Sequence, residues 1–392
     1  MDKQVIDALL GAMIQSREGV SDLLFTVGKP PLVETHGWLE EFVVETPEPV
    51  FGSKEIDQLA DHIINGNERL LRDLTTWGSC DCSYALKDVA RFRVNIFKQN
   101  GKPAIVMRKL QSEVPTLDAL HLPAVFQEIV KEKNGIIFIT GATGSGKTTT
   151  LAAMLNELNQ TQQIHIITLE DPIEFLHPHR RAVFHQRELG NDFPDFARGL
   201  RAALRQAPKV ILVGEIRDRE TMEIAMTASE TGHIVFTTLH TIDAGQTINR
   251  ILGMFAKDEE QFLRQRLADT VRYIVSQRLV SKIGGGRLLL TEIMGSSLRT
   301  RETLLYGESE GRTFQEIIEA GSTLGWHSFD QSILKAYEAD LISEDTALIF
   351  CAHKHKMRKD IDLLKKLREG SFEMPSGLQM QTEADMGAES VS

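Results

Sequence analysis

Between residue 121 and about residue 285, short apolar runs alternate with longer segments of helical periodicity. The runs are "GIIFIT" (135–140), "HIITLE" (165–170), "KVILVGE" (209–215) and "HIVFTTL" (233–239). Short β-branched runs separated by helix-length segments are typical of buried parallel strands joined by crossover helices. We therefore predict an α/β core over residues 121–285, with a parallel sheet covered by helices on both faces.

The pattern differs on either side of this core. Residues 1–110 mix an amphipathic helix pattern at the N-terminus with strand-like runs such as "SDLLFTV" and "ARFRVNIF", which predicts a separate α+β domain. Residues 111–120 are a predicted linker that begins with polar residues and contains a proline. Residues 286–370 have mostly helical patterns. The acidic tail at 371–392 has few large apolar residues, and we expect it to be disordered.

The stretch "GATGSGKTTT" at 141–150 directly follows the first apolar run of the core and precedes a helix pattern. It fits the phosphate-loop motif G-x-x-x-x-G-K-[ST], in which backbone N–H groups and a lysine hold phosphates and a hydroxyl completes a magnesium shell. A glycine turn that arose by chance is the alternative. The motif predicts binding of ATP with Mg²⁺ by Gly141, Thr143, Gly144, Ser145, Gly146, Lys147, Thr148 and Thr149.

Acidic residues follow two of the other predicted strands. Glu215 comes just after "VILVG", where its carboxylate would project from the edge of the sheet that binds ligands in α/β folds. This is a Walker B position, suited to completing a Mg²⁺ shell or polarising water, although a solvated acid at a strand end is the alternative. The cluster Glu170, Asp171 and Glu174 follows "HIIT". We choose Glu170 for a metal or water role, with a structural cap as the alternative.

Two histidines, His233 and His240, lie at the ends of the run "IVFTTL". A histidine close to a γ-phosphate could donate a hydrogen bond that depends on the state of the nucleotide. A histidine beside an apolar strand can equally be a satisfied structural residue, and the sequence pattern does not separate these two interpretations.

The charge and the cysteines limit the possible functions. The formal net charge is −11, which disfavours a DNA-translocating motor, because nucleic acid binding requires concentrated lysine and arginine. The three cysteines include no C-x-x-C pair, so neither a disulfide framework nor a four-thiolate zinc site is expected. We find no signal peptide and no apolar run long enough to span a bilayer, so we expect a cytoplasmic protein.

In this order and spacing, "GATGSGKTTT", "LEDPIEF", "VILVGEIRD" and "GHIVFTTLHT" resemble the Walker A, Asp, Walker B and His boxes of the type II/IV secretion ATPases. The resemblance covers roughly residues 5–350 and is greatest to the PilT/PilU retraction ATPases of type IV pili. It implies a homo-hexamer in which a PAS-like N-terminal domain precedes a RecA-like core. It also implies that Glu215 activates water, that Glu170 assists, and that His233 and His240 sense the nucleotide.

The same resemblance implies that arginines of the first domain complete the nucleotide site. Arg91, Arg93 and Arg108 lie where the family has them. Because strand residues two apart point to the same face, Arg91 and Arg93 would lie together, as a phosphate clamp requires. Exposed strand arginines are the alternative.

The resemblance implies a motor that retracts pili at an inner-membrane platform protein, to which it would bind peripherally. Retraction is favoured over pilus extension because the four-cysteine zinc module of the extension ATPases is missing. However, "SSLRTRETLLYGESEGRTF" replaces an "AIRNLIREGK"-type segment that is important for retraction in PilT-like proteins. An accessory ring subunit that supports a paralogous retraction ATPase is therefore a second hypothesis, and a DNA-translocating motor is a third. We expect no nucleic acid partner.

Overall fold

The computed structural model describes residues 3–43, 50–87, 89–111 and 113–368. The tail at 371–392, for which we predict disorder, lies outside these residues. The chain divides into two compact units. One comprises Met1–Arg278 and Glu292–His327, and the other comprises Leu279–Thr291 and Ser328–Ser392. Among the described residues, no helix combines the length and the apolar composition needed to cross a membrane.

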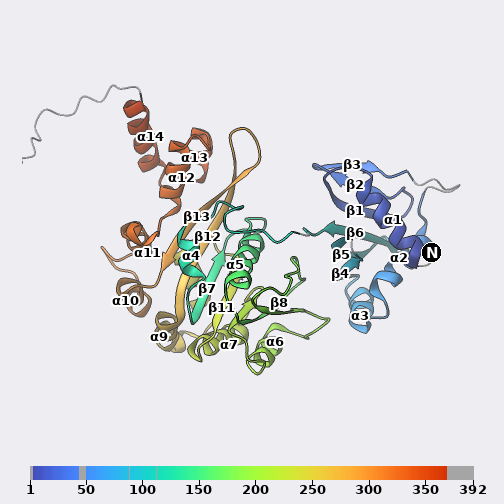
Figure 1. The fold of residues 1–392 in the computed structure, drawn as a ribbon, viewed down its shortest axis with the longest axis horizontal. Coiled ribbons are helices and arrows are strands. Elements are labelled where there is room, and N and C mark those ends of the chain that lie inside the picture. Colours follow the sequence, from blue (N-terminus) through green and yellow to red (C-terminus); the bar gives the residue numbers. More distant parts are fainter. Residues whose placement is uncertain (1–2, 44–49, 88, 112, 369–392) are drawn as a thin grey trace, which may run out of the picture. The chain divides into compact units, whose positions relative to one another are not determined.

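The first unit contains two sheets, and the N-terminal one has six strands in the order β3-β2-β1-β6-β5-β4. Every pairing between neighbouring strands in this sheet is antiparallel. The elements, labelled in Figure 1, are α1 (Lys3–Gln15), β1 (Val20–Thr26), β2 (Leu32–Thr35), β3 (Trp38–Glu41), α2 (Ser53–Ile64), α3 (Glu68–Thr76), β4 (Ser79–Leu86), β5 (Ala90–Gln99) and β6 (Lys102–Lys109).

Strand β5 shows why this sheet has one apolar face and one polar face. Phe92, Val94 and Ile96 are fully buried in the core under the sheet. Arg91 and Arg93 alternate with them and therefore point to the opposite face, because side chains along a strand alternate. This alternation gives the two arginines one common face.

The second sheet has seven strands in the order β13-β12-β7-β11-β10-β8-β9. Parallel pairing extends from β12 through β7, β11, β10 and β8 to β9. The strands are β7 (Gly135–Thr140), β8 (His165–Glu170), β9 (Val183–Glu188), β10 (Val210–Val213), β11 (Ile234–Leu239), β12 (Val271–Ser281) and β13 (Arg287–Gly295). A strand forms at each of the four apolar runs, and the predicted α/β class is confirmed.

Both faces of this sheet are covered, which explains why its strands are continuously apolar. Ile136 and Phe138 of β7 belong to one buried cluster, whereas Ile137 and Ile139 belong to another. The helices of this part are α4 (Val125–Ile129), α5 (Lys147–Thr161), α6 (Phe196–Ala203), α7 (Arg219–Glu230), α8 (Ala244–Leu252), α9 (Glu260–Thr270), α10 (Leu298–Tyr306) and α11 (Phe314–Ala320). Residues of α5 pack in the second cluster, and residues of α6, α7 and α9 pack in the first.

Strand β13 falls within the region 286–370, for which we predict mostly helices. Its sequence "RLLLTEIMG" has consecutive apolar residues without strand alternation, because its second half is buried on both sides. The second unit contains the adjoining parts of β12 and β13 with α12 (Phe329–Glu338), α13 (Glu344–Phe350) and α14 (Lys354–Arg368). A separate small core, which includes Ile333 and Ile361, holds this unit together.

Candidate functional site

The predicted site residues gather where the parallel strands of the second sheet end. The last residues of β7 and β11 are register partners, as are Val213 of β10 and Leu169 of β8. Strand β7 therefore leads into the loop 141–146 at the same edge where β8 ends in Glu170, β10 leads to Glu215, and β11 leads to His240. Open α/β sheets bind ligands at this edge, because the loops that follow the strands converge there.

The glycine-rich loop between β7 and α5 has the backbone of a phosphate cradle. Gly141, Gly144 and Gly146 all have positive φ angles, of 144°, 77° and 88°. A Cβ atom on Gly141 would lie 2.6 Å from the carbonyl oxygen of Gln277, so a larger residue cannot occupy this position without a shift. The Lys147 ammonium donates hydrogen bonds to the carbonyl oxygens of Gly141 and Ala142 at 2.8 and 2.9 Å.

Several unsatisfied groups in this loop fit a bound phosphate. The Ser145 hydroxyl is buried and has no hydrogen-bond partner. Helix α5 begins at Lys147 without a side-chain cap on its first N–H groups, because its N-cap is Gly146. Thr143 and Gly144 are exposed, and Thr148 and Thr149 are half-buried. Free N–H groups at the start of a fifteen-residue helix attract anions, so the cradle is suited to phosphate.

Glu215 lies two residues beyond β10, and its side chain is only 15% exposed. It forms an ion pair with Arg217, and its Oε2 atom lies 3.7 Å from His240 Nε2. Burial lowers the pKa of Lys147, and the carboxylates of Glu215 and Glu174 oppose that effect. The predicted lysine and the predicted acid are therefore close enough to interact at one edge of the sheet.

Glu170 is buried at the end of β8. Its Oε1 atom accepts hydrogen bonds from the Thr168 hydroxyl at 2.6 Å and from Gln186 Nε2 at 3.1 Å. Burial raises the pKa of Glu170 to about 7, and these two hydrogen bonds reduce the rise. A carboxyl group with such a pKa can exchange a proton near neutral pH. A residue that serves only as a structural cap does not need to change its charge in this range.

We define residues 171–174 as the acid loop. This loop follows β8 in the chain, and its last residue, Glu174, is hydrogen-bonded to Thr148 at the phosphate loop. The Thr148 hydroxyl donates a hydrogen bond to the Glu174 carboxylate. Burial raises the pKa of Glu174, and this bond and the charges of Arg93 and Arg108 oppose the rise. Glu174 therefore contacts the hydroxyl that the motif assigns to magnesium.

The three predicted clamp arginines lie in two different environments. Arg93 and Arg108 are cross-strand partners on β5 and β6, and their charges act on Glu174. Arg108 is exposed and pairs with Asp22 at 2.9 Å. Arg91 is largely buried, and its guanidinium donates to the carbonyl oxygen of Ile173 at 3.1 Å. Arg93 and Arg108 thus remain near the acid loop with exposed side chains, whereas Arg91 is held by the loop's backbone.

The two predicted histidines are not brought together. His240 follows β11 at the phosphate-loop edge, and burial and the Lys147 charge lower its pKa. His233 precedes β11, and its Nδ1 atom lies 2.9 Å from the carbonyl oxygen of Ala228. Six strand residues separate the two histidines, or about 20 Å at the rise of a strand. From this position, His233 cannot contact a nucleotide that is bound in the phosphate loop of the same subunit.

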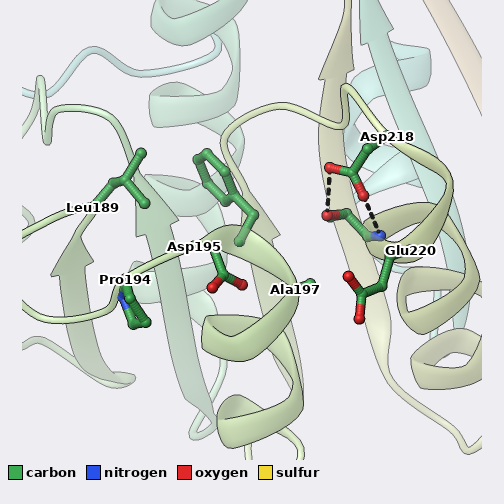
Figure 2. A pocket seen from close by; sticks show the side chains of 8 residues that line it. Leu189, Pro194, Asp195, Ala197, Asp218 and Glu220 are labelled. Atoms are coloured by element: carbon green, nitrogen blue, oxygen red, sulfur yellow. Dashed lines mark hydrogen bonds between the residues drawn. The ribbon is translucent and has the colours of Figure 1, made fainter.

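Figure 2 shows side chains that line a surface pocket beside the first turns of α6 and α7. The pocket has a volume of about 290 Å³, and its lining residues do not include the phosphate loop. Its residues Asp195 and Asp218 are helix N-caps, which accept hydrogen bonds from the backbone N–H groups of Arg198 and Thr221. Because these carboxylates are already satisfied locally, their presence in the pocket does not indicate a ligand.

Three residues beside the site are missing from the sequence predictions. Arg217 pairs with Glu215, Gln186 binds Glu170, and Glu188 ends β9. Strand β9 reads "VFHQRE" and is mostly polar, so its sequence has no strong strand signal. The sequence offers one weak signal for Glu188. It is the acid at the end of a polar segment that lies, along the chain, between two apolar runs.

The parallel sheet and its phosphate loop define a P-loop nucleotide-binding protein. Residues 82–288 match the family model for type II/IV secretion system proteins. The type IV pilus retraction ATPase PilT of Pseudomonas aeruginosa is 39% identical over 332 residues, which are 85% of this chain and 94% of that protein. The type IV pilus ATPase PilU of the same organism is 32% identical over 373 residues, which are 93% of this chain and 95% of that protein.

A crystal structure of the pilus retraction motor PilT with bound ADP has a TM-score of 0.79 to this chain at 36% identity. The match covers 91% of this chain and 99% of that one. The chain therefore belongs to the type II/IV secretion ATPases and, within them, to the PilT/PilU family of pilus retraction ATPases.

Proposed function

We propose that this protein is an ATP-hydrolysing motor that powers retraction of a type IV pilus and so twitching motility. The observation that carries the proposal is the convergence of Lys147, Glu215 and the Glu174–Thr148 pair at one sheet edge. The similarity to PilT over 94% of that protein supports the same conclusion.

ATP would be held by the loop 141–149. The uncapped start of α5, the unpartnered Ser145 hydroxyl and the Lys147 ammonium would receive its phosphates. Mg²⁺ would arrive with the nucleotide and neutralise phosphate charge, and we assign Thr148 and Glu215 to hold it. Lys147 now binds two loop carbonyl oxygens, and we expect it to exchange them for phosphate oxygens.

Hydrolysis requires a water molecule aligned with the terminal phosphorus and charge stabilisation as the bond to ADP breaks. We assign the orientation of that water to Glu215, whose carboxylate is largely buried beside His240. We assign Glu170 an assisting role as a proton acceptor, because it changes charge near neutral pH. His240 would contact the reacting end of the nucleotide, and we make no such proposal for His233. Arg93 and Arg108 would add positive charge.

Mechanical work requires that ATP binds two conformations with different affinities. Arginines on the N-terminal sheet can supply that difference, because they contact nucleotide only when the sheet lies against the core. We propose that the N-terminal part is PAS-like, that residues 121–285 are a RecA-like core, and that six copies form a ring. In this proposal the ring works in the cytoplasm on an inner-membrane platform protein of the pilus machine.

An accessory role is the second candidate, and the segment 296–314 favours it. There the chain carries α10, with Leu298 81% exposed and Tyr306 73% exposed, in place of the expected "AIRNLIREGK"-type sequence. Altered contacts at this surface would leave ATP hydrolysis intact but would make retraction depend on a paralogous motor. A relative named PilU, aligned over 93% of this chain, is compatible with either role.

A genetic comparison separates these candidates. Pilus retraction is measured in cells that carry this protein alone, the paralogous motor alone, both or neither. A primary motor retracts pili unaided, whereas an accessory subunit raises retraction only in the presence of the paralogue. Absence of any effect in both backgrounds would contradict the proposal. DNA-stimulated ATPase activity with salt-sensitive DNA binding would indicate a DNA motor instead.

A further inference from the structure

The Glu188 carboxylate lies at the end of β9, next to the proposed site, and has no role in the proposal so far. Glu188 is the register partner of Glu170 and is 5% exposed. Its Oε1 atom accepts hydrogen bonds from the Ser83 hydroxyl and from Asn191 Nδ2, both at 2.7 Å. Its Oε2 atom accepts a hydrogen bond from the backbone N–H of Ile173 at 3.2 Å.

Arg91 binds the same segment of backbone from the other side. One guanidinium nitrogen donates to the carbonyl oxygen of Ile173 at 3.1 Å, and another lies 3.8 Å from Glu188 Oε2. The N–H and the C=O of Ile173 are therefore both held, one by Glu188 and one by Arg91. Arg91 is 19% exposed, so water competes little for these contacts.

The position of Ile173 matters because it lies within the acid loop, one residue before Glu174. The Glu174 carboxylate accepts a hydrogen bond from the Thr148 hydroxyl of the phosphate loop. A continuous series of contacts thus connects Glu188 to Thr148 through the backbone of residues 173 and 174. Displacement of Ile173 would displace Glu174 relative to Thr148.

The groups around residue 188 present donors that a carboxylate can accept. Ser83, Asn191, Ile173 and Arg91 all present donors to Glu188. A glutamine could keep its carbonyl oxygen on Ile173 and Arg91, because the Ser83 hydroxyl and a rotated Asn191 amide can accept its N–H groups. A methionine, which has a similar length and no strong acceptor, would leave all four donors without this partner.

From these contacts we propose that Glu188 is a positioning residue of the ATPase site: together with Arg91 it fixes Ile173, so that Glu174 reaches Thr148. The inference deepens the proposed function and rests on it. Glu188 itself touches neither nucleotide nor water in this account, because it acts through the acid loop.

The kinetic test compares the full-length protein with Glu188→Met, Glu188→Asp and the control Ser83→Ala. Loss of alignment at the hydroxyl of Thr148 should lower the kcat of Glu188→Met by about 10- to 100-fold. KM for ATP should change by less than about threefold, because the phosphate-loop contacts remain. Glu188→Asp keeps the charge and should recover part of kcat. Ser83→Ala removes one donor only and should keep the parent's kcat.

A second measurement does not depend on hydrolysis. Hydrogen exchange of the Ile173 amide should be about tenfold or more faster in Glu188→Met than in the parent, because its acceptor is lost. It should be unchanged in Ser83→Ala. If Glu188→Met does not fold, Glu188→Asp gives both readings, with smaller changes in the same direction.

The outcomes distinguish this inference from the proposed function. A parent protein without ATPase activity would contradict the proposed function, whereas Ile173 exchange would still decide whether Glu188 fixes the acid loop. Unchanged exchange at Ile173 in Glu188→Met would overturn the inference. If the parent hydrolyses ATP, an unchanged kcat in Glu188→Met would also overturn it. A purely structural role would lower the melting temperature of Glu188→Met while the folded fraction kept the parent's kcat.

Discussion

The raised pKa of Glu170 predicts how the activity of this protein depends on pH. Burial raises the pKa from an ordinary value of 4.5 to about 7, a difference of about 2.5 pH units. At about 1.4 kcal/mol per unit, ionisation of Glu170 is about 3 kcal/mol harder than in water. If the ionised form assists hydrolysis, activity should increase as pH rises through 7.

The assay is kcat/KM for ATP between pH 5.5 and 8.5, which reports groups of the free enzyme. With a pKa of about 7, about a tenth of Glu170 is ionised at pH 6 and about nine tenths at pH 8. The parent should therefore be about tenfold less active at pH 6 than at pH 8. His240 should titrate at a pH below 6.5, because burial lowers its pKa from that ordinary value.

Two variants test the assignment. Glu170→Gln should be less active than the parent and should lack the rise through pH 7. Gln186→Leu removes a hydrogen bond that lowers the pKa of Glu170, so the rise should move to higher pH. If Glu170→Gln retains the parent's rise with the same midpoint, Glu170 is not the group that titrates near pH 7.

Two further predictions concern stability. Burial lowers the pKa of His177 to about 4, so this residue should cost folding up to about 3 kcal/mol as pH falls from 6.5 to 4. Because protonation of Glu170 acts in the opposite direction over this range, urea titrations should compare the parent with His177→Phe at each pH. The parent should lose that amount relative to the variant, and parallel curves of stability against pH would contradict this expectation. Gly141→Ala should destabilise the nucleotide-free protein by about 2 kcal/mol more than Gly144→Ala, because only the Cβ at position 141 would clash with the carbonyl oxygen of Gln277. Equal melting temperatures of the two variants would exclude this clash.

Much of the core could be predicted from sequence, because its buried strands are short apolar runs with turn residues between them. The run at 135–140 and the phosphate loop after it are local signals, and each is complete within ten residues. Glu170 ends β8 and Glu215 lies two residues beyond β10, so their common edge follows from the parallel pairing of these two strands.

The rest depends on contacts that sequence spacing does not encode. Strand β9 is polar, since two of its side chains, Gln186 and Glu188, serve as hydrogen-bond partners and not as core. The different environments of Arg91 and Arg93 arise from where the acid loop lies, although both side chains share one face of β5. His233 lies far from the phosphate loop because it precedes β11, whereas His240 follows it. The presence of a histidine at each end of the run does not by itself reveal this difference.

The most direct test of the motor is ATP hydrolysis by the purified parent protein beside Glu215→Gln, with nucleotide binding and oligomer mass measured for both. Turnover should fall by about two or more orders of magnitude in Glu215→Gln, while ATP binding and the oligomer mass are unchanged. Equal turnover by the two proteins would show that the carboxylate beside the phosphate loop does not activate water, and the proposed motor mechanism would be wrong.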